Sequence, residues 1–232
     1  TPTPPAPTVV PLSFSDVLVS SFGQGLIDTT VGGIAFDSSN NIYVTDTNGH
    51  EIIKFNSSGN QIKSWGSGMA SGNTCGGCPD GYVAVPHGIV TDSTGNLYVT
   101  EANDNRIQKF DGDGNFIAKW NRISQSSNQG PIGIALDSAA NLYVATLDDF
   151  VHILDRNTGA QLSSWSSGSG YNGGIAIDSL NNVYIVGGNS GVIQKFSVAG
   201  NLILQFGNVA NPNSEGREVG LFDRPAGIAT DS

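Results

Sequence analysis

The segment from Cys75 to Cys78 holds the two cysteines of the chain, separated by two glycines. A Cys-x-x-Cys pair can be a redox couple, half of a zinc site or a short disulfide. A zinc site would need two further ligands, the chain has no other cysteine, and no βαβ pattern accompanies the pair. We therefore predict a structural disulfide between Cys75 and Cys78, which closes a glycine-rich loop in an oxidising compartment.

A second segment begins like a calcium-binding loop of the pattern Asp-x-Asp-x-Asn, formed here by Asp111, Asp113 and Asn115. The sixth position of such a loop is glycine and the twelfth is glutamate, but this chain has Phe116 and Arg122 there. Asp, Asn and Gly are also the residues that favour tight turns. We expect a turn between two strands at this segment, with calcium binding as the alternative.

Glycosylation is the third chemistry that the residue pattern indicates. Asn56 begins the only Asn-x-Ser/Thr sequon. Residues 1–11 are rich in Pro and Thr, a composition typical of O-glycosylated stalks and equally of interdomain linkers. If the segment is a stalk, the candidate attachment sites are Thr1, Thr3 and Thr8. In either case we assign residues 1–11 to a tether and residues 12–232 to the folded domain.

A five-residue unit, Gly-Ile-x-x-Asp, indicates how these segments are positioned, because it recurs along the chain. Its copies start at Gly33, Gly88, Gly133, Gly174 and Gly227. A repeat of roughly 40 to 55 residues suits a propeller blade. Within each repeat, apolar and polar residues alternate in short runs, and no stretch keeps the 3.6-residue period of a helix. We predict an all-β propeller of four-stranded antiparallel blades.

Two of the repeats carry the pattern in full. Residues 33–66, GIAFDSSNNIYVTDTNGHEIIKFNSSGNQIKSWG, and residues 88–120, GIVTDSTGNLYVTEANDNRIQKFDGDGNFIAKW, closely resemble the NHL repeat. The resemblance extends over residues 18–232, and the third copy departs from it at residues 147–150, where one loop is a residue shorter. The resemblance implies a propeller that usually has six blades and is closed by a strand from one terminus, which completes the blade of the other.

Both ends of the chain fall inside blades in this alignment. Residues 17–23 resemble a fourth strand and the copy at residue 227 resembles a first strand, so four complete blades are flanked by partial ones. Open sheet edges are templates for pairing, and we expect them at Val17, Val19, Ile228 and Thr230. Two explanations stay open: the chain is part of a longer propeller, or another chain completes it by strand addition.

The resemblance also raises zinc as a cofactor. The peptidyl-hydroxyglycine amidating lyases, a propeller family similar to NHL proteins, bind zinc through histidines at the starts of several blades, and His87 lies at such a position. The equivalent positions in the other repeats carry no histidine: Gly32, Ile132, Gly173 and Ala226. Because a zinc site needs at least three protein ligands, we expect no zinc here. His50 falls in a loop, and we expect His152 to point outward from a third strand.

Other recurring residues have structural explanations. Asp46 and Glu101 end second strands, where lactonase-type propellers carry metal-binding carboxylates, but two other repeats have Thr146 and Gly187 there. We therefore expect Asp46 and Glu101 to make loop-stabilising hydrogen bonds. Aromatic residues end the fourth strands, and we expect them to pack between blades. They are Phe22, Trp65, Trp120, Trp165 and Phe206.

The charge balance limits the partners. Lys and Arg total 10 against 20 Asp and Glu, and the net charge of −10 repels nucleic acids and anionic membranes. We expect a non-catalytic extracellular or cell-surface scaffold without a cofactor. It would present loops to protein or glycan partners, or be a subunit of a surface layer or filament. The alternative is a lyase or lactonase dependent on zinc or calcium, with its metal ligands on blades outside this chain.

Overall fold

The computed structural model describes residues 30–67, 78–126, 129–170, 172–188, 190–207, 222 and 225–230. Its strands form four antiparallel sheets, named here blades A to D in chain order. Blade A holds β1 (Val31–Phe36), β2 (Ile42–Asp46), β3 (Glu51–Phe55) and β4 (Gln61–Trp65). Blade B holds β5 (Pro86–Thr91), β6 (Leu97–Glu101), β7 (Arg106–Phe110) and β8 (Phe116–Asn121). Blade C holds β9 (Pro131–Leu136), β10 (Leu142–Thr146), β11 (Phe150–Leu154) and β12 (Gln161–Ser166). Blade D holds β13 (Asn172–Ile177), β14 (Val183–Gly187), β15 (Val192–Phe196) and β16 (Leu202–Gly207).

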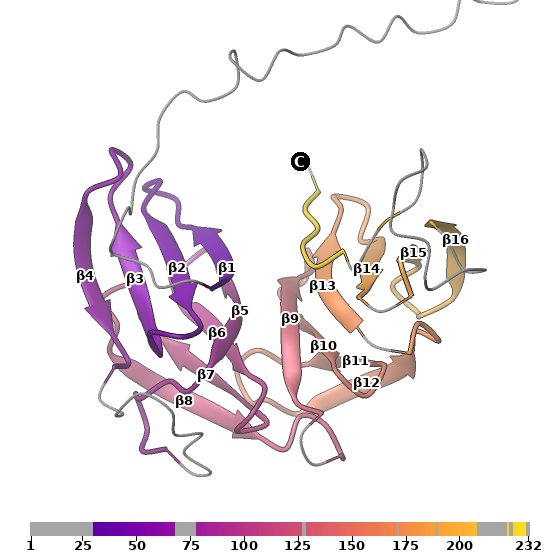
Figure 1. The fold of residues 1–232 in the computed structure, drawn as a ribbon, viewed down its shortest axis with the longest axis horizontal. Coiled ribbons are helices and arrows are strands. Elements are labelled where there is room, and N and C mark those ends of the chain that lie inside the picture. Colours follow the sequence, from indigo (N-terminus) through magenta and orange to yellow (C-terminus); the bar gives the residue numbers. More distant parts are fainter. Residues whose placement is uncertain are drawn as a thin grey trace, which may run out of the picture.

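The blades follow one another around an open arc (Figure 1). The first strands β1, β5, β9 and β13 lie on the inner side of the arc, and the fourth strands lie on the outer side. This arrangement confirms the predicted propeller of four-stranded blades. In the part of the chain that is described, no helix is long and apolar enough to cross a membrane.

The fifth copy of the repeated unit continues the series of inner strands. Ala226 O accepts a hydrogen bond from Gly174 N at 2.8 Å, and Thr230 Oγ1 donates to Ile177 O at 2.8 Å. The same threonine contact joins blades A and B, where Thr91 Oγ1 donates to Phe36 O at 2.5 Å. Residues 225–230 therefore lie beside β13 as β5 lies beside β1.

The Asp of each unit explains why the chain turns sharply after the first strand. Asp37 accepts hydrogen bonds from the backbone N of Asn41 at 2.9 Å, from its Nδ2 at 2.8 Å and from the Tyr43 hydroxyl at 3.0 Å. Such bonds replace the ladder partners that the turn residues lack. The same Asp-to-Asn bonding recurs in the other blades, at Asp92, Asp137 and Asp178.

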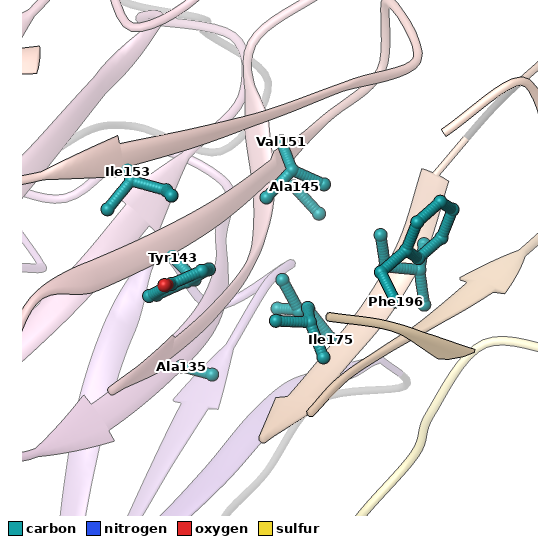
Figure 2. Packing of buried hydrophobic residues seen from close by; sticks show 9 residues of the cluster. Ala135, Tyr143, Ala145, Val151, Ile153, Ile175 and Phe196 are labelled. Carbon is teal, nitrogen blue, oxygen red and sulfur yellow. The ribbon is translucent and has the colours of Figure 1, made fainter. Parts of the chain in front are cut away.

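The tryptophans of the fourth strands pack between blades, as predicted, whereas Phe206 is 41% exposed and Phe22 lies outside the described residues. The ring of Trp65 in blade A lies 6.4 Å from that of Phe110 in blade B, and Trp165 in blade C lies 6.2 Å from Phe196 in blade D. Figure 2 shows the cluster between blades C and D, in which Tyr143 of β10 packs with Ile175 of β13. Apolar burial between successive blades is therefore the main force that holds the arc together.

One face of blade A is not covered in this way. Ile34 of β1 is 53% exposed, whereas its equivalents Ile89, Ile134 and Ile175 are 6–7% exposed. Each equivalent is buried against the preceding blade, and the described residues place no blade against this side of β1. The difference shows that the face of blade A that carries Ile34, which corresponds to the face packed against the preceding blade in blades B to D, is at an open end of the arc.

Candidate functional site

Two kinds of connection lie at one end of the blades. They are the turns between second and third strands and the segments that lead from one blade to the next, which lie at the same end of an antiparallel blade. We call this set the loop face: residues 47–50, 78–85, 102–105, 122–126, 147–149, 166–170, 188 and 190–191.

A buried ion pair lies beneath the loop face in blade B. Glu101 ends β6 and Arg106 begins β7, and the antiparallel register places the two residues opposite each other. Arg106 donates from Nε to Glu101 Oε1 and from Nη2 to Glu101 Oε2, both at 2.9 Å. The side chains of Glu101 and Arg106 are 0% and 3% exposed. The pair is thus bidentate, which is the strongest geometry for these two groups.

The ion pair holds the segment 78–84, which joins blades A and B. Arg106 donates to Cys78 O at 2.9 Å and to Tyr82 O at 2.8 Å. Gln108 Nε2 donates to Tyr82 O at 2.7 Å, and Ala84 N donates to Glu101 Oε2 at 2.8 Å. These hydrogen bonds pair the carbonyl oxygens of Cys78 and Tyr82 and the N–H of Ala84, so the segment 78–84 is held in one conformation.

One guanidinium faces two buried carboxylates in the clamp, because Arg106 Nη2 also lies 3.5 Å from Asp104 Oδ2. Burial raises the pKa of the Glu101 carboxyl, while the hydrogen bonds and positive charge of Arg106 oppose that rise. A carboxylate enclosed by a guanidinium, an amide and a backbone N–H is held in place rather than offered to a substrate. The expectation that Glu101 stabilises a loop is confirmed, and so is that for Asp46, whose Oδ1 accepts from Gly49 N at 2.8 Å.

Tyr82 is what the clamp presents to solvent. Its carbonyl oxygen is held by Arg106 and Gln108, yet its side chain is 40% exposed. Tyrosine combines a large apolar surface with a hydroxyl and few rotatable bonds, which makes it a common anchor at protein interfaces. The sequence reasoning missed Tyr82, Arg106 and Gln108. For Arg106 a signal existed, because an Arg-Ile-x-Lys-Phe run belongs to the repeat pattern.

The three histidines lie in different settings. His50 lies in the β2–β3 turn, where its Nδ1 accepts a hydrogen bond from Val85 N at 3.0 Å and so ties blade A to the clamped segment. His87 lies on β5, and burial lowers its pKa. The expectation that His152 points outward is wrong, because it is 4% exposed. It takes the same register position as Gln108, opposite the second strand, and its Nε2 has no hydrogen-bond partner among the described residues.

The predicted calcium segment folds as a turn. Asp111 Oδ1 accepts hydrogen bonds from Asp113 N and Asn115 N at 2.9 Å each, and its Oδ2 accepts from Asn115 Nδ2 at 2.8 Å. This is the bonding seen at the other Asp-to-Asn turns, so the expected turn is confirmed and accounts for the residue pattern. The residues that the structure describes bring together no group of three or more His, Cys, Asp or Glu side chains that could hold a metal ion.

Several predicted sites fall outside the described residues or stay predictions. Cys75 lies outside them, so the Cys75–Cys78 disulfide stays a prediction, and Cys78 is buried with its carbonyl bound by Arg106. Asn56 lies in the β3–β4 turn, where its Oδ1 accepts from Ser58 N at 3.0 Å, and its glycosylation stays a prediction. Further candidate sites outside the described residues are Thr1, Thr3, Thr8, Val17 and Val19.

Comparison with known proteins identifies the repeats. The sequence model of the NHL repeat matches residues 31–55 and 84–110, which hold β1 to β3 of blade A and β5 to β7 of blade B. The β-propeller therefore contains NHL repeats. No curated protein sequence matches this propeller.

Solved structures share the propeller fold at low sequence identity. A streptogramin B lyase is 18% identical, with a TM-score of 0.65 over 88% of this chain and 60% of the lyase. The virginiamycin B lyase of Staphylococcus aureus is 15% identical, with a TM-score of 0.62 over 87% of this chain and 60% of that protein. U3-55K is 14% identical, with a TM-score of 0.62 over 77% of this chain and 52% of that protein. This NHL-repeat chain therefore spans about three fifths of the lyases, and the likeness concerns the fold alone.

Proposed function

We propose that this NHL-repeat propeller is a non-catalytic interaction scaffold of the extracellular space or cell surface, and that it recognises a protein partner through the loop face around Tyr82. The observation that carries the proposal is the clamp. A buried ion pair fixes a connecting segment and leaves one large aromatic side chain exposed on it. A rigid aromatic anchor loses little conformational entropy on binding, which favours affinity.

The extracellular location rests on the sequence. The Pro/Thr-rich residues 1–11, the predicted disulfide and the Asn56 sequon all suit a secreted protein. The net charge of −10 suits neither a nucleic acid nor an anionic lipid surface. Glycans are a further class of partner, because an exposed tyrosine also stacks on sugar rings.

Self-assembly into a surface layer or filament belongs to the same proposal. In blades A to C, a Cβ on the glycine that starts each unit would lie within 3 Å of the next inner strand, as for Gly88 at 2.5 Å from Ile132 O. At Gly227 such a Cβ would meet nothing within 4 Å. Residues 225–230 thus have room beside them for a further strand, and an Ile228→Pro variant should reduce any polymerisation because proline removes a ladder donor.

A lyase is the second candidate function, and the likeness to the two lyase structures favours it. One further structure of the virginiamycin B lyase is described as a catalytically inactive histidine-to-alanine variant with quinupristin. In this chain His87 belongs to β5, the inner strand of blade B. The test is consumption of quinupristin by the purified protein, followed by chromatography, with His87→Ala as the control.

The interaction proposal is tested by crosslinking the full chain to proteins of the cell surface and culture medium of its source, followed by mass spectrometry. Tyr82→Ala should lose the proteins that wild type captures. Ile117→Ala is the matched control, because Ile117 is 48% exposed on the outer strand β8, away from the loop face. Equal capture by wild type and Tyr82→Ala would contradict the proposal, as would a loss common to both variants.

A further inference from the structure

A carboxylate without a cationic partner lies in the loop face between blades C and D. Asp149, in the β10–β11 turn, has a positive φ of 74° and directs its side chain at residues 166–170. Its Oδ1 accepts from Ser169 N at 2.9 Å, Gly170 N at 3.0 Å and Ser167 Oγ at 2.5 Å. Its Oδ2 accepts from Gly168 N at 3.0 Å and Ser166 Oγ at 2.8 Å.

The donors come from a backbone shape that binds anions. Gly168 and Gly170 have positive φ values of 70° and 79°, and they alternate with serines. Such alternation turns successive N–H groups toward one point and forms a concave site called a nest. None of the ion pairs found in the described residues involves Asp149. The negative charge is therefore stabilised by five N–H and O–H donors.

The nest is supported from beneath. Asn172 at the start of β13 is 0% exposed, and its Oδ1 accepts from Ser169 Oγ at 3.0 Å. The Nδ2 of Asn172 donates to Phe150 O at 2.9 Å, at the start of β11. Ser167 N also donates to the carbonyl oxygen of Asp149 at 2.9 Å. The loop is thus fixed on blade C and on blade D, which is the preorganisation that an anion site requires.

We propose that residues 166–170 form an anion-binding nest for a carboxylate, that Asp149 is its resident ligand, and that the pair latches blade C to blade D on the loop face. A small free carboxylate would bind the same donors once the Asp149 side chain is removed. The hydrogen bonds also lower the pKa of Asp149 below its ordinary value, although burial alone would raise it. The latch goes beyond the proposed function and does not depend on it.

The test is thermal unfolding of the full chain with sodium formate or sodium chloride at equal ionic strength. Asp149→Gly empties the nest and suits the positive φ, so the backbone itself is not strained. This variant should melt lower than wild type, by on the order of 5 °C. Formate should raise its melting temperature and leave that of wild type unchanged relative to chloride. An equal response to formate in both proteins would overturn the inference.

Asp149→Asn is the matched variant. It keeps the shape of the side chain but replaces one acceptor oxygen by an NH₂ group, which faces N–H and O–H donors and cannot accept hydrogen bonds from them. Asp149→Asn should therefore melt lower than wild type. Because its side chain still fills the nest, it should not respond to formate. Hydrogen exchange supplies a readout on wild type alone. The amides of Gly168, Ser169 and Gly170 should exchange more slowly than that of Gly95, whose N–H bonds within a surface turn. Exchange at the same rate would contradict a closed latch.

Discussion

Gly114 of blade B lies over the indole ring of Trp65 in blade A, so closely that a Cβ at Gly114 would stand 2.5 Å from Trp65 Cδ2. The same relationship joins Gly159 to Trp120 and Gly200 to Trp165. Each interface between described blades therefore takes a tryptophan from the earlier blade and a hairpin glycine from the later one. The hairpin glycine has two roles: it allows the positive φ of the turn, and it leaves room for the tryptophan ring.

Replacing Gly114 by alanine should separate these two roles. Gly114 and Gly95 have nearly the same φ, 82° and 83°, but a Cβ at Gly95 would meet nothing within 4 Å. Gly95→Ala should lower the free energy of unfolding by about 1 kcal/mol through the backbone alone. Gly114→Ala should cost roughly 1–3 kcal/mol more, because Trp65 must move. Urea denaturation measures both, and equal losses would mean that the contact with Trp65 is unimportant.

Breaking the buried clamp should be far more damaging than breaking a surface ion pair. Arg106→Met leaves Glu101 buried without its partner, and we expect a loss of about 3–5 kcal/mol in the free energy of unfolding. Adding Glu101→Leu should restore part of that loss, because only one of the two buried carboxylates that Arg106 pairs with, that of Asp104, then remains. Lys119→Met is the control: its pair with Asp80 is partly exposed and contributes about 0–1 kcal/mol. Similar losses for Arg106→Met and Lys119→Met would contradict the clamp.

Acid should destabilise the protein through Asp92. Burial raises the pKa of this carboxyl, but hydrogen bonds from Thr94 and Asn96 outweigh it and hold the pKa at about 2. A pKa lowered by folding stabilises the folded state above the unfolded value of about 3.9, and that stability is lost as pH falls toward 2. Asp92→Asn should therefore lose less stability than wild type between pH 5 and pH 2. Parallel curves from chemical denaturation across this range would refute the assignment.

The hydroxyl of Thr45 on β2 bonds to the inner strands of both blade A and blade B. Thr45 Oγ1 accepts from Gly33 N at 2.7 Å and donates to His87 O at 2.6 Å, at a fully buried position. Thr45→Val should leave both backbone groups unpaired and cost roughly 1–3 kcal/mol. Thr45→Ser keeps the hydroxyl and should lose less. Calorimetry of the two variants provides the comparison, and a serine variant no more stable than the valine variant would exclude a role for the hydrogen bonds.

The repeated features of the fold could be predicted because each has several copies to compare. The Gly-Ile-x-x-Asp unit and the tryptophans that end fourth strands recur at the same register, and the structure places them as expected. Only one residue of the clamp could be predicted from the sequence. Glu101 was expected to stabilise a loop. The contacts of Arg106 to Cys78 and Tyr82 were not expected, because they involve a segment inserted only once, between blades A and B.

The nest around Asp149 could not be predicted for a related reason. It depends on positive φ values at three residues and on the direction of three N–H groups, which no local period encodes. His152 was misassigned because its position matches polar residues in two other repeats, and polarity was taken as a sign of exposure. In fact Gln108 and Gln194 are also buried, at 0% and 4% exposed, so this register position faces the neighbouring blade.

The direction of the tryptophan–glycine contacts bears on how such a protein can evolve. Blade A already carries the hairpin glycine, Gly59 with a φ of 80°, and blade D carries Phe206 at the tryptophan position. Duplication of one whole repeat therefore creates a new interface that contains both the aromatic residue and the hairpin glycine. The copy receives an aromatic ring from the preceding blade and supplies one to the following blade. Gene duplication can lengthen the array without any compensating change in the packing between repeats.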